Sequence, residues 1–411
     1  MNVLQINQFD FLGGAAIAAY RLHQGLIAKG FSSKLLVGAA KTGSRAVAVI
    51  PRKYRLENQL SRLTSPLGLN NVNLLGAFDI PKHPYYQEAD VLNFHNLHNG
   101  YFNYLALPSL TKNKPAIITL HDMWSFTGHC AYSFGCDRWK TGCGKCPHLD
   151  AYPSISKDCS HLEWKLKDWV YSRSRLTVVT PSKWMAEQAK QSMLKRFPIH
   201  HIPNGVDTEA YQPLDPEVCR AALGIPGNKK VLIFGAQRLT DSRKGGNSLL
   251  EALQKLPDSI KAEIVLLTLG DGSEGISTMI GMPIFNLGYV SSDRLKTVAY
   301  SAADLLVFPT RADNLPIVLQ ESMACGTPAV SCKVGGVPEL IRPGVTGYLA
   351  EPGNPADLCK GILELLEDHA LRDRLGQHCR EIAVQEYSLE LQVKRYTDLY
   401  QQAIGQFSGC S

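Results

Sequence analysis

The sequence contains no run of 18 or more apolar residues, and charged residues make up only 19 % of its 411 residues. The first absence excludes a helix that spans a membrane. Met1 leads directly into a strand-like segment at residues 3–6, without a basic segment and cleavage site of the kind that directs export. We therefore expect a cytoplasmic protein.

The sequence also lacks the biased composition of fibrous and disordered proteins. Apolar residues make up 45 %, and 34 Gly and 23 Pro are spread through the chain. This balance excludes collagen, mucin-like and coiled-coil proteins and is typical of a globular α/β protein. A length of 411 residues predicts two domains, or three.

Positive charge is concentrated in the first half of the chain. Residues 1–203 hold 24 basic and 12 acidic residues, whereas residues 204–411 hold 19 and 25. The halves therefore carry +12 and −6. Such an asymmetry indicates an anionic partner for the first half, and an ordinary solvated basic surface explains it equally well.

Short apolar runs rich in β-branched residues alternate with helical patterns, which predicts a parallel α/β architecture. The runs cover residues 91–94, 116–120, 176–179, 231–235, 264–269, 305–308 and 329–332. The alternation restarts near Val231, after a Pro-, Asn- and Gly-rich segment at 202–207. We predict two doubly wound domains, 1–203 and 204–387, and expect the helical segment 388–411 to return to the first domain.

Two loops that follow predicted strands are candidates for binding an anion. Gly13 and Gly14 precede a helical run, where backbone amides approach a ligand easily, although the segment is not a dinucleotide fingerprint and such turns usually bind nothing. A basic loop from Arg238 to Lys244 follows the strand at 231–235, and its cations suit a diphosphate. Three cations in a solvated loop are common, so this loop alone decides nothing.

The segment from Phe308 to Pro328 is the strongest local pattern. It predicts a strand, a turn and a helix that begins near Pro316 and ends before Gly326, with Asp313 or Asn314 as the N-cap. Glu321 lies inside this helix on a face that is otherwise apolar. Capping by Asp313 and a buried ion pair at Glu321 explain the pattern as well as sugar and ribose binding do.

Four cysteines lie within 17 residues, with the spacing C-x5-C-x6-C-x2-C. They are Cys130, Cys136, Cys143 and Cys146. Four thiols in a reducing compartment suit a structural zinc site that would hold the insertion at 128–150, with His129 and His148 as spare ligands. Free thiols, an iron–sulfur cluster and a disulfide pair are the alternatives.

These motifs together resemble those of the family-4 retaining glycosyltransferases of the GT-B fold. The resemblance spans nearly the whole chain and follows the family order of motifs; the segment His121 to Gly128 with the cysteines is similar to the colanic-acid and exopolysaccharide branch. The motifs are Gly13-Gly14, Thr119-Leu120-His121-Asp122, Thr180-Pro181-Ser182, Pro203-Asn204-Gly205-Val206-Asp207, Arg238 with Lys244, Gly270-Asp271-Gly272, Leu287-Gly288-Tyr289-Val290 and the block from Asp313 to Glu321.

The resemblance implies two Rossmann-like domains that face a central cleft, and a role for each motif. Arg238 and Lys244 hold the donor diphosphate, although their spacing is one residue longer than usual. The family has Glu at both ends of the last block; here Glu321 matches the ribose ligand, and Asp313 replaces the Glu that binds the donor sugar. His121 matches the family histidine near the reacting carbon. The further substrate-binding residues that it implies are Gly13, Gly14, Gly272, Asn314 and Leu315.

We therefore predict a retaining glycosyltransferase that moves a sugar from a nucleoside-diphosphate sugar to a saccharide or lipid-linked saccharide, with no cofactor for catalysis and no nucleic-acid partner. The alternatives are a sugar-nucleotide epimerase or phosphorylase of the same fold, and a non-catalytic basic or zinc-scaffold binding protein. The segment 52–63 combines four basic residues with an apolar stripe, so we also expect peripheral contact with the inner face of the membrane; a solvated surface helix is the alternative.

Overall fold

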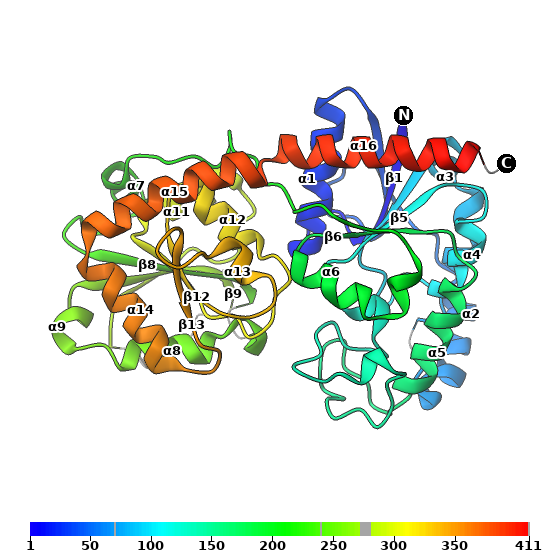
Figure 1. Cartoon of the computed structure of the whole chain (residues 1–411), viewed down its shortest axis with the longest axis horizontal. Coiled ribbons are helices and arrows are strands. Elements are labelled where there is room, and N and C mark those ends of the chain that lie inside the picture. Colours follow the sequence, from blue (N-terminus) through cyan, green and yellow to red (C-terminus); the bar gives the residue numbers. More distant parts are fainter. Residues whose placement is uncertain (70, 239–240, 272–280, 410–411) are drawn as a thin grey trace. The chain divides into compact units, whose positions relative to one another are not determined.

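The computed structural model describes the chain except for residues 70, 239–240, 272–280 and 410–411, and the side chains of residues 237 and 238. The chain divides into two compact units (Figure 1). The first comprises Met1–Pro203 with Gln392–Ser411, and the second comprises Asn204–Leu391.

The first unit is built on a seven-stranded sheet in the order β3-β2-β1-β4-β5-β6-β7, and every neighbouring pair is parallel. All four residues of β4 and of β5 are buried, as expected for central strands covered on both faces. The strands are β1 (Asn2–Phe9), β2 (Ser32–Ala39), β3 (Val47–Val49), β4 (Val91–Phe94), β5 (Ala116–Thr119), β6 (Thr177–Thr180) and β7 (Ile199–His201).

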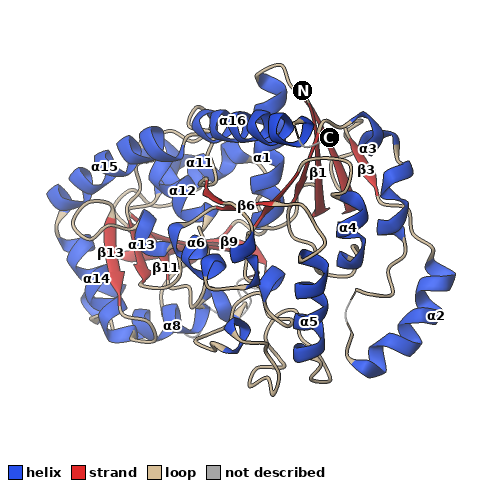
Figure 2. Cartoon of the chain, turned by 45° about the vertical axis from the view of Figure 1, so that its right-hand side comes forward, coloured by secondary structure: helices blue, strands red, loops and turns tan. Residues whose placement is uncertain are grey.

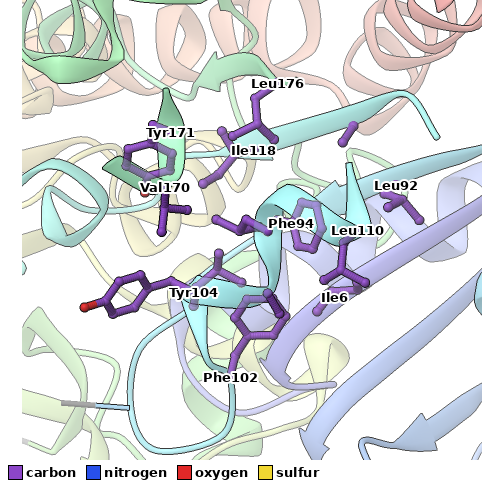
Figure 3. Close-up of a cluster of buried hydrophobic side chains, with 14 of the residues drawn as sticks. Ile6, Leu92, Phe94, Phe102, Tyr104, Leu110, Ile118, Val170, Tyr171 and Leu176 are labelled. Atoms are coloured by element: carbon purple, nitrogen blue, oxygen red, sulfur yellow. The ribbon is translucent and has the colours of Figure 1, made fainter. Parts of the chain in front are cut away.

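Helices cover the first sheet (Figure 2). The helices of this unit are α1 (Gly14–Ala28), α2 (Tyr54–Thr64), α3 (Pro84–Glu88), α4 (Leu107–Leu110), α5 (Ser160–Tyr171) and α6 (Lys183–Lys190). Figure 3 shows part of the core, in which β1, β4 and β5 pack against α4 and α5. Its labelled members include Ile6, Leu92, Phe94, Leu110, Ile118, Val170 and Tyr171.

The second unit repeats this topology with six parallel strands in the order β10-β9-β8-β11-β12-β13. Its strands are β8 (Lys230–Arg238), β9 (Ile264–Asp271), β10 (Ile284–Asn286), β11 (Leu305–Phe308), β12 (Ala329–Cys332) and β13 (Gly347–Ala350). Its helices are α7 (Pro216–Ala222), α8 (Gly246–Gln254), α9 (Asp258–Lys261), α11 (Asp293–Ala302), α12 (Ile317–Ala324), α13 (Val337–Leu340), α14 (Pro355–Glu367) and α15 (His369–Tyr387).

The last helix, α16 (Leu389–Ser408), begins in the second unit and packs for most of its length on the first. The Tyr396 hydroxyl lies 3.0 Å from the Thr119 hydroxyl, and the amide nitrogen of Asn93 donates to Tyr400 at 2.9 Å. Both tyrosines are buried. Polar contacts to β4 and β5 therefore hold α16 against the first sheet.

The predicted fold class is confirmed, because both sheets are parallel and both strand orders are those of doubly wound domains. All seven apolar runs are strands, and three of them have the predicted bounds. Among the described residues, none of the helices is both long enough and apolar enough to cross a bilayer.

Candidate functional site

The basic loop of the second unit lies against the end of β11. Asp241 caps a short 3₁₀ turn, Ser242–Lys244, by accepting from the backbone N–H of Arg243 at 2.9 Å. The backbone N–H of Arg311 donates to the Arg243 carbonyl at 2.8 Å. Gly245 has φ +80°, and a Cβ there would lie 1.8 Å from the Pro309 carbonyl oxygen. Only glycine allows this close approach, which brings the basic loop to the residues after β11.

Two cations of this loop converge on the buried carboxylate of Asp313. Lys244 Nζ lies 2.6 Å and Arg243 Nη1 3.3 Å from Asp313 Oδ2, and the backbone N–H of Asn314 donates to Oδ1 at 3.0 Å. Burial raises the pKa of Asp313, but the two cations outweigh it and leave the pKa below its usual value. Burial also lowers the pKa of Lys244, and Asp313 opposes this shift. The Asp241 carboxylate also lies 3.4 Å from Arg243 Nη2, so two cations and two carboxylates form one charged cluster.

Arg243 is the member of this cluster that sequence reasoning missed. The predicted arginine, Arg238, is the last residue of β8, and its side chain is outside the described part of the chain. Gly272 also lies outside the described residues. A signal for Arg243 was present, since it directly precedes Lys244. Its place in the cluster depends on a contact with Asp313, 70 residues later in the sequence, and the spacing of residues along the chain does not reveal such a contact.

The expected N-cap of α12 is wrong in detail. The helix begins at Ile317 with Pro316 at the N-cap and no side-chain cap, because the Asp313 carboxylate turns to Lys244 and Arg243 instead. Asn314 and Leu315 are buried in the turn before the helix. Gly335 has φ +53°, and a Cβ there would lie 1.8 Å from the Asp313 carbonyl oxygen. This second glycine lets the loop after β12 pack on the Asp313 backbone.

Glu321 is buried, and its partners are hydroxyl groups more than cations. Tyr211 donates to Oε1 at 3.1 Å and Tyr300 donates to Oε2 at 3.0 Å, while Lys296 Nζ lies 3.7 Å from Oε1. The single proton of the Tyr211 hydroxyl is shared with Asp293 Oδ1, which lies closer, at 2.6 Å. A buried carboxylate held in this way can accept hydrogen bonds from hydroxyl groups, which is the chemistry that ribose binding requires.

In the first unit, Gly13 and Gly14 form the start of α1. Gly13 is the N-cap with φ +88°, and its carbonyl accepts from the backbone N–H of Ile17 at 3.0 Å. Gly14 is the first residue of the helix and is exposed. The turn therefore presents backbone at the positive end of a 15-residue helix, as the sequence predicts.

His121 follows β5 and belongs to a group of three histidines. Its Nε2 lies 2.9 Å from Nδ1 of His95, and the two ring centroids are 5.2 Å apart. Next to it, Nε2 of His98 lies 2.8 Å from Oδ2 of Asp122. Burial lowers the pKa of His121 to about 4. The side chain is therefore a neutral imidazole at neutral pH.

A buried lysine holds the loop that follows His121. Lys167 Nζ donates to the carbonyls of Trp124 at 2.6 Å and Thr127 at 3.0 Å, and lies 3.5 Å from the centre of the Trp124 ring. The other carboxylate oxygen of Asp122, Oδ1, accepts from the Trp124 backbone N–H at 2.9 Å. Lys167 and Asp122 thus both hold this loop through hydrogen bonds to its backbone.

The four cysteines of the insertion line one small cavity of about 20 Å³, together with His129. His129 Nε2 lies 3.3 Å from the sulfur of Cys146, and the backbone N–H of Gly128 donates to the Cys143 sulfur at 3.2 Å. Within the part of the chain that the structure describes, no three His, Cys, Asp or Glu side chains are placed so that they could hold a metal ion. The cysteines are gathered around one cavity, but they are not arranged as a tetrahedral site.

The zinc prediction therefore requires the cysteine side chains to turn inward around the metal. Native purified protein should contain about one zinc ion per chain, bound as four thiolates. Elemental analysis of the purified protein measures this directly, and a Cys143→Ser, Cys146→Ser variant is the control. Less than about a tenth of an equivalent, with all four thiols rapidly titratable, would show free cysteines.

Comparisons with known proteins identify the family of the chain. The family model described as glycosyl transferases group 1 matches residues 216–382, and the model described as glycosyltransferase family 4 matches residues 12–210. The Escherichia coli colanic acid biosynthesis glycosyl transferase WcaC is 31 % identical over 363 residues, which cover 83 % of this chain and 85 % of that protein. The chain belongs to the group 1 glycosyltransferases.

Other relatives of this glycosyltransferase include the N-acetyl-alpha-D-glucosaminyl L-malate synthase of Bacillus anthracis, 28 % identical over 49 % of this chain and 53 % of that protein. Among solved structures, sucrose-phosphate synthase from Thermosynechococcus elongatus has a TM-score of 0.73 at 18 % identity, and covers 99 % of this chain and 100 % of that chain. The structure of Anabaena HepE in complex with UDP and glucose has a TM-score of 0.70 at 18 % identity. The match covers 98 % of this chain and 100 % of that chain. This glycosyltransferase therefore has the GT-B fold.

Proposed function

We propose that the protein transfers a sugar from a nucleoside-diphosphate sugar to a saccharide or lipid-linked saccharide acceptor, with retention at the anomeric carbon and without a catalytic metal. The observation that carries this proposal is the convergence of Lys244 and Arg243 on Asp313, directly before α12. The similarity to WcaC favours polysaccharide or glycoconjugate synthesis.

The donor-binding chemistry comes from the second unit. Lys244 and Arg243 place two cations beside Asp313, and both carry N–H groups that can donate to the oxygens of a diphosphate. The N-terminus of α12 adds backbone N–H groups without a side-chain cap. Glu321 accepts hydrogen bonds from the ribose hydroxyls, and Asp313 accepts a hydrogen bond from a hydroxyl of the donor sugar.

The reaction exchanges one carbon–oxygen bond for another. The acceptor oxygen attacks the anomeric carbon, the bond from that carbon to the diphosphate breaks, and the acceptor proton passes to the departing diphosphate. Negative charge grows on the diphosphate in the transition state, and the pre-positioned cations Lys244 and Arg243 stabilise it there. The same residues also hold the diphosphate in the ground state. They therefore accelerate the reaction only to the extent that they stabilise the diphosphate more strongly as the bond to the anomeric carbon breaks.

A thermal-shift screen against UDP, GDP and ADP sugars tests the donor class, because a ligand that binds the folded chain raises its unfolding temperature by mass action. The donor that gives the largest shift is then incubated with saccharide acceptors, and the anomeric configuration of the product is read by NMR. An inverted product, or a donor that is epimerised without transfer, contradicts the proposal.

We also propose that α2 binds an anionic membrane surface. Leu56 and Leu63 are 53 % and 69 % exposed, and with half-buried Leu60 they form one stripe of the helix. Figure 2 shows α2 at the periphery of the first unit, away from the sheet. Exposed Arg55 and Arg62 supply positive charge on the same helix. The apolar stripe and the cations together suit a bilayer that carries lipid-linked acceptors.

The structure changes which basic residues should matter for this contact. Arg52 binds the buried carboxylate of Glu57 at 2.6 Å, and Lys53 pairs with Asp79. These two cations are therefore partly neutralised within the protein. Glu57 also accepts from the backbone N–H groups of Leu75 and Gly76, so it is a structural residue rather than an interruption of the apolar stripe.

We expect the protein to sediment with anionic liposomes at low salt and to be released at high salt, since each basic residue near the surface contributes about 1 kcal/mol before screening. The double variant Arg55→Gln, Arg62→Gln should lose most of this binding. Lys183→Gln, an exposed change on α6, is the matched control. Binding that is absent with anionic vesicles, or that is unchanged in the double variant, would show that α2 is an ordinary surface helix.

A further inference from the structure

The side chain of Gln5 is buried in β1, and its neighbours allow only one orientation of its amide. The backbone carbonyl of Ala19 can only accept a hydrogen bond, and the backbone N–H of His23 can only donate one. The amide nitrogen of Gln5 therefore donates to the Ala19 carbonyl at 3.2 Å, and its oxygen accepts from the His23 N–H at 3.3 Å. These two backbone groups fix which end of the amide faces the histidines.

The second proton of the Gln5 amide points at His95. The distance from the amide nitrogen to Nε2 of His95 is 3.0 Å, so Nε2 is the acceptor and carries no proton. Burial lowers the pKa of His95 well below its usual value, so the ring is neutral and its one proton is on Nδ1. That proton is donated to Nε2 of His121, 2.9 Å away.

His121 receives its tautomer from this chain of donors. Because its Nε2 accepts from His95, the proton of the neutral ring is on Nδ1. We propose that Gln5 and His95 are positioning residues that hold His121 as the Nδ1–H tautomer, so that it offers the donor sugar a hydrogen-bond donor rather than a base. The inference rests on the proposed function only in naming the sugar as the group that receives this bond.

The hydrogen bonds on the other side of Gln5 have the same donor-to-acceptor direction. The Ser33 hydroxyl donates to the Gln5 oxygen at 3.2 Å, and Nδ1 of His23 donates to the Ser33 oxygen at 2.8 Å. Among the described residues, Nε2 of His23 has no hydrogen-bond partner, which suits the nitrogen that carries no proton. Every donor from His23 to His95 is thus aimed toward His121, and bonds in such a chain polarise one another.

This tautomer restricts what His121 can do in the reaction. Nδ1 already carries the proton, and Nε2 is engaged by His95, so the neutral ring has no free lone pair for the acceptor's proton. The proton that leaves the acceptor hydroxyl therefore does not pass to His121, which is consistent with its transfer to the departing diphosphate in the proposed reaction. His121 instead donates to an oxygen of the sugar and orients it.

The tautomer is measured directly in the unmodified, unliganded protein. Histidine labelled with ¹⁵N distinguishes protonated from bare ring nitrogens by NMR, and the His121 signals are assigned by their loss in His121→Gln. We expect protonated Nδ1 and bare Nε2 for both His95 and His121. A protonated Nε2 on His121 would overturn the inference, whether or not the protein transfers sugar.

Two variants on either side of Gln5 separate positioning from general packing. Gln5→Met keeps the volume and removes the donor to His95, so His121 should lose its single tautomer and kcat should fall by about tenfold, the scale for losing an outer partner of a working histidine, with the donor KM nearly unchanged. Ser33→Ala removes a buried partner of Gln5 but leaves the amide donor in place, so the tautomer should persist.

An unchanged His121 spectrum in Gln5→Met would refute the role of Gln5, and so would a tautomer shift of equal size in Ser33→Ala. If Gln5→Met does not fold, the spectrum of the unmodified protein still decides, because a protonated Nε2 on His95 is incompatible with donation from Gln5. A chain that shows the expected tautomers but transfers no sugar would contradict the proposed function and leave this inference standing.

Discussion

Lys244→Ala is expected to reduce sugar transfer by roughly a hundredfold or more, on the order of 3 kcal/mol, which is the scale for losing one pre-positioned charge stabiliser. The physical reason is that Lys244 is one of two cations beside Asp313. Without it, Arg243 alone faces the carboxylates of Asp313 and Asp241, and the diphosphate loses one of its two proposed cations. Initial rates with a saturating donor measure the effect.

The controls for Lys244 address charge, fold and location. Lys244→Arg keeps the charge and should retain more activity than Lys244→Ala. Lys360→Ala removes an exposed cation from the same unit and should leave turnover unchanged. The unfolding temperature shows whether the Ala variant is folded. Equal turnover by the unmodified protein and a folded Lys244→Ala variant would refute the assignment of this loop to the diphosphate.

Glu321→Gln is expected to weaken binding of the free nucleoside diphosphate by about tenfold or more, and each tenfold corresponds to roughly 1.4 kcal/mol. Glu321 accepts from the hydroxyls of both Tyr211 and Tyr300, one on each carboxylate oxygen. Glutamine keeps one oxygen and turns an NH₂ group toward the other hydroxyl, so ribose meets a weaker and disordered acceptor. Calorimetry with the bare nucleoside diphosphate measures the loss.

Asp313→Asn provides the contrast to Glu321→Gln. It removes the negative charge beside Lys244 and Arg243 and should reduce turnover more than nucleotide affinity, because Asp313 is assigned to the donor sugar. Tyr300→Phe is the control for packing around Glu321, since it removes one hydroxyl and keeps the carboxylate. A large loss of nucleotide affinity in Asp313→Asn, with none in Glu321→Gln, would reverse the two roles.

The strand pattern was predictable because a central parallel strand is buried on both faces and therefore appears as a continuous apolar run. The runs that became β4, β11 and β12 have the predicted bounds. The end of α12 before Gly326 was predictable for a similar local reason, since Gly326 has φ +74°. Signals of this kind depend only on residues that are close in the sequence, so they can be interpreted without knowledge of the fold.

The roles of polar side chains were harder to predict, because their partners lie far away in the sequence. Capping of a helix was one of two interpretations of Asp313, and its carboxylate binds cations about 70 residues earlier instead. Arg243 was passed over in favour of Arg238 for the same reason. The pairing of His95 with His121 requires that β4 and β5 be neighbours in the sheet, which spacing along the chain does not specify.

The sequence by itself determined the fold class, the point at which the α/β alternation restarts, and the residue types of the proposed donor site, because each depends on local burial or on a short motif. Only the tertiary structure decided the partners. It placed α16 against the first sheet through Tyr396 and Tyr400, and it gathered the cysteines around one cavity. It also oriented the amide of Gln5, and with it the proton of His121, because a hydrogen bond depends on distance and direction between atoms that the chain brings together only when it folds.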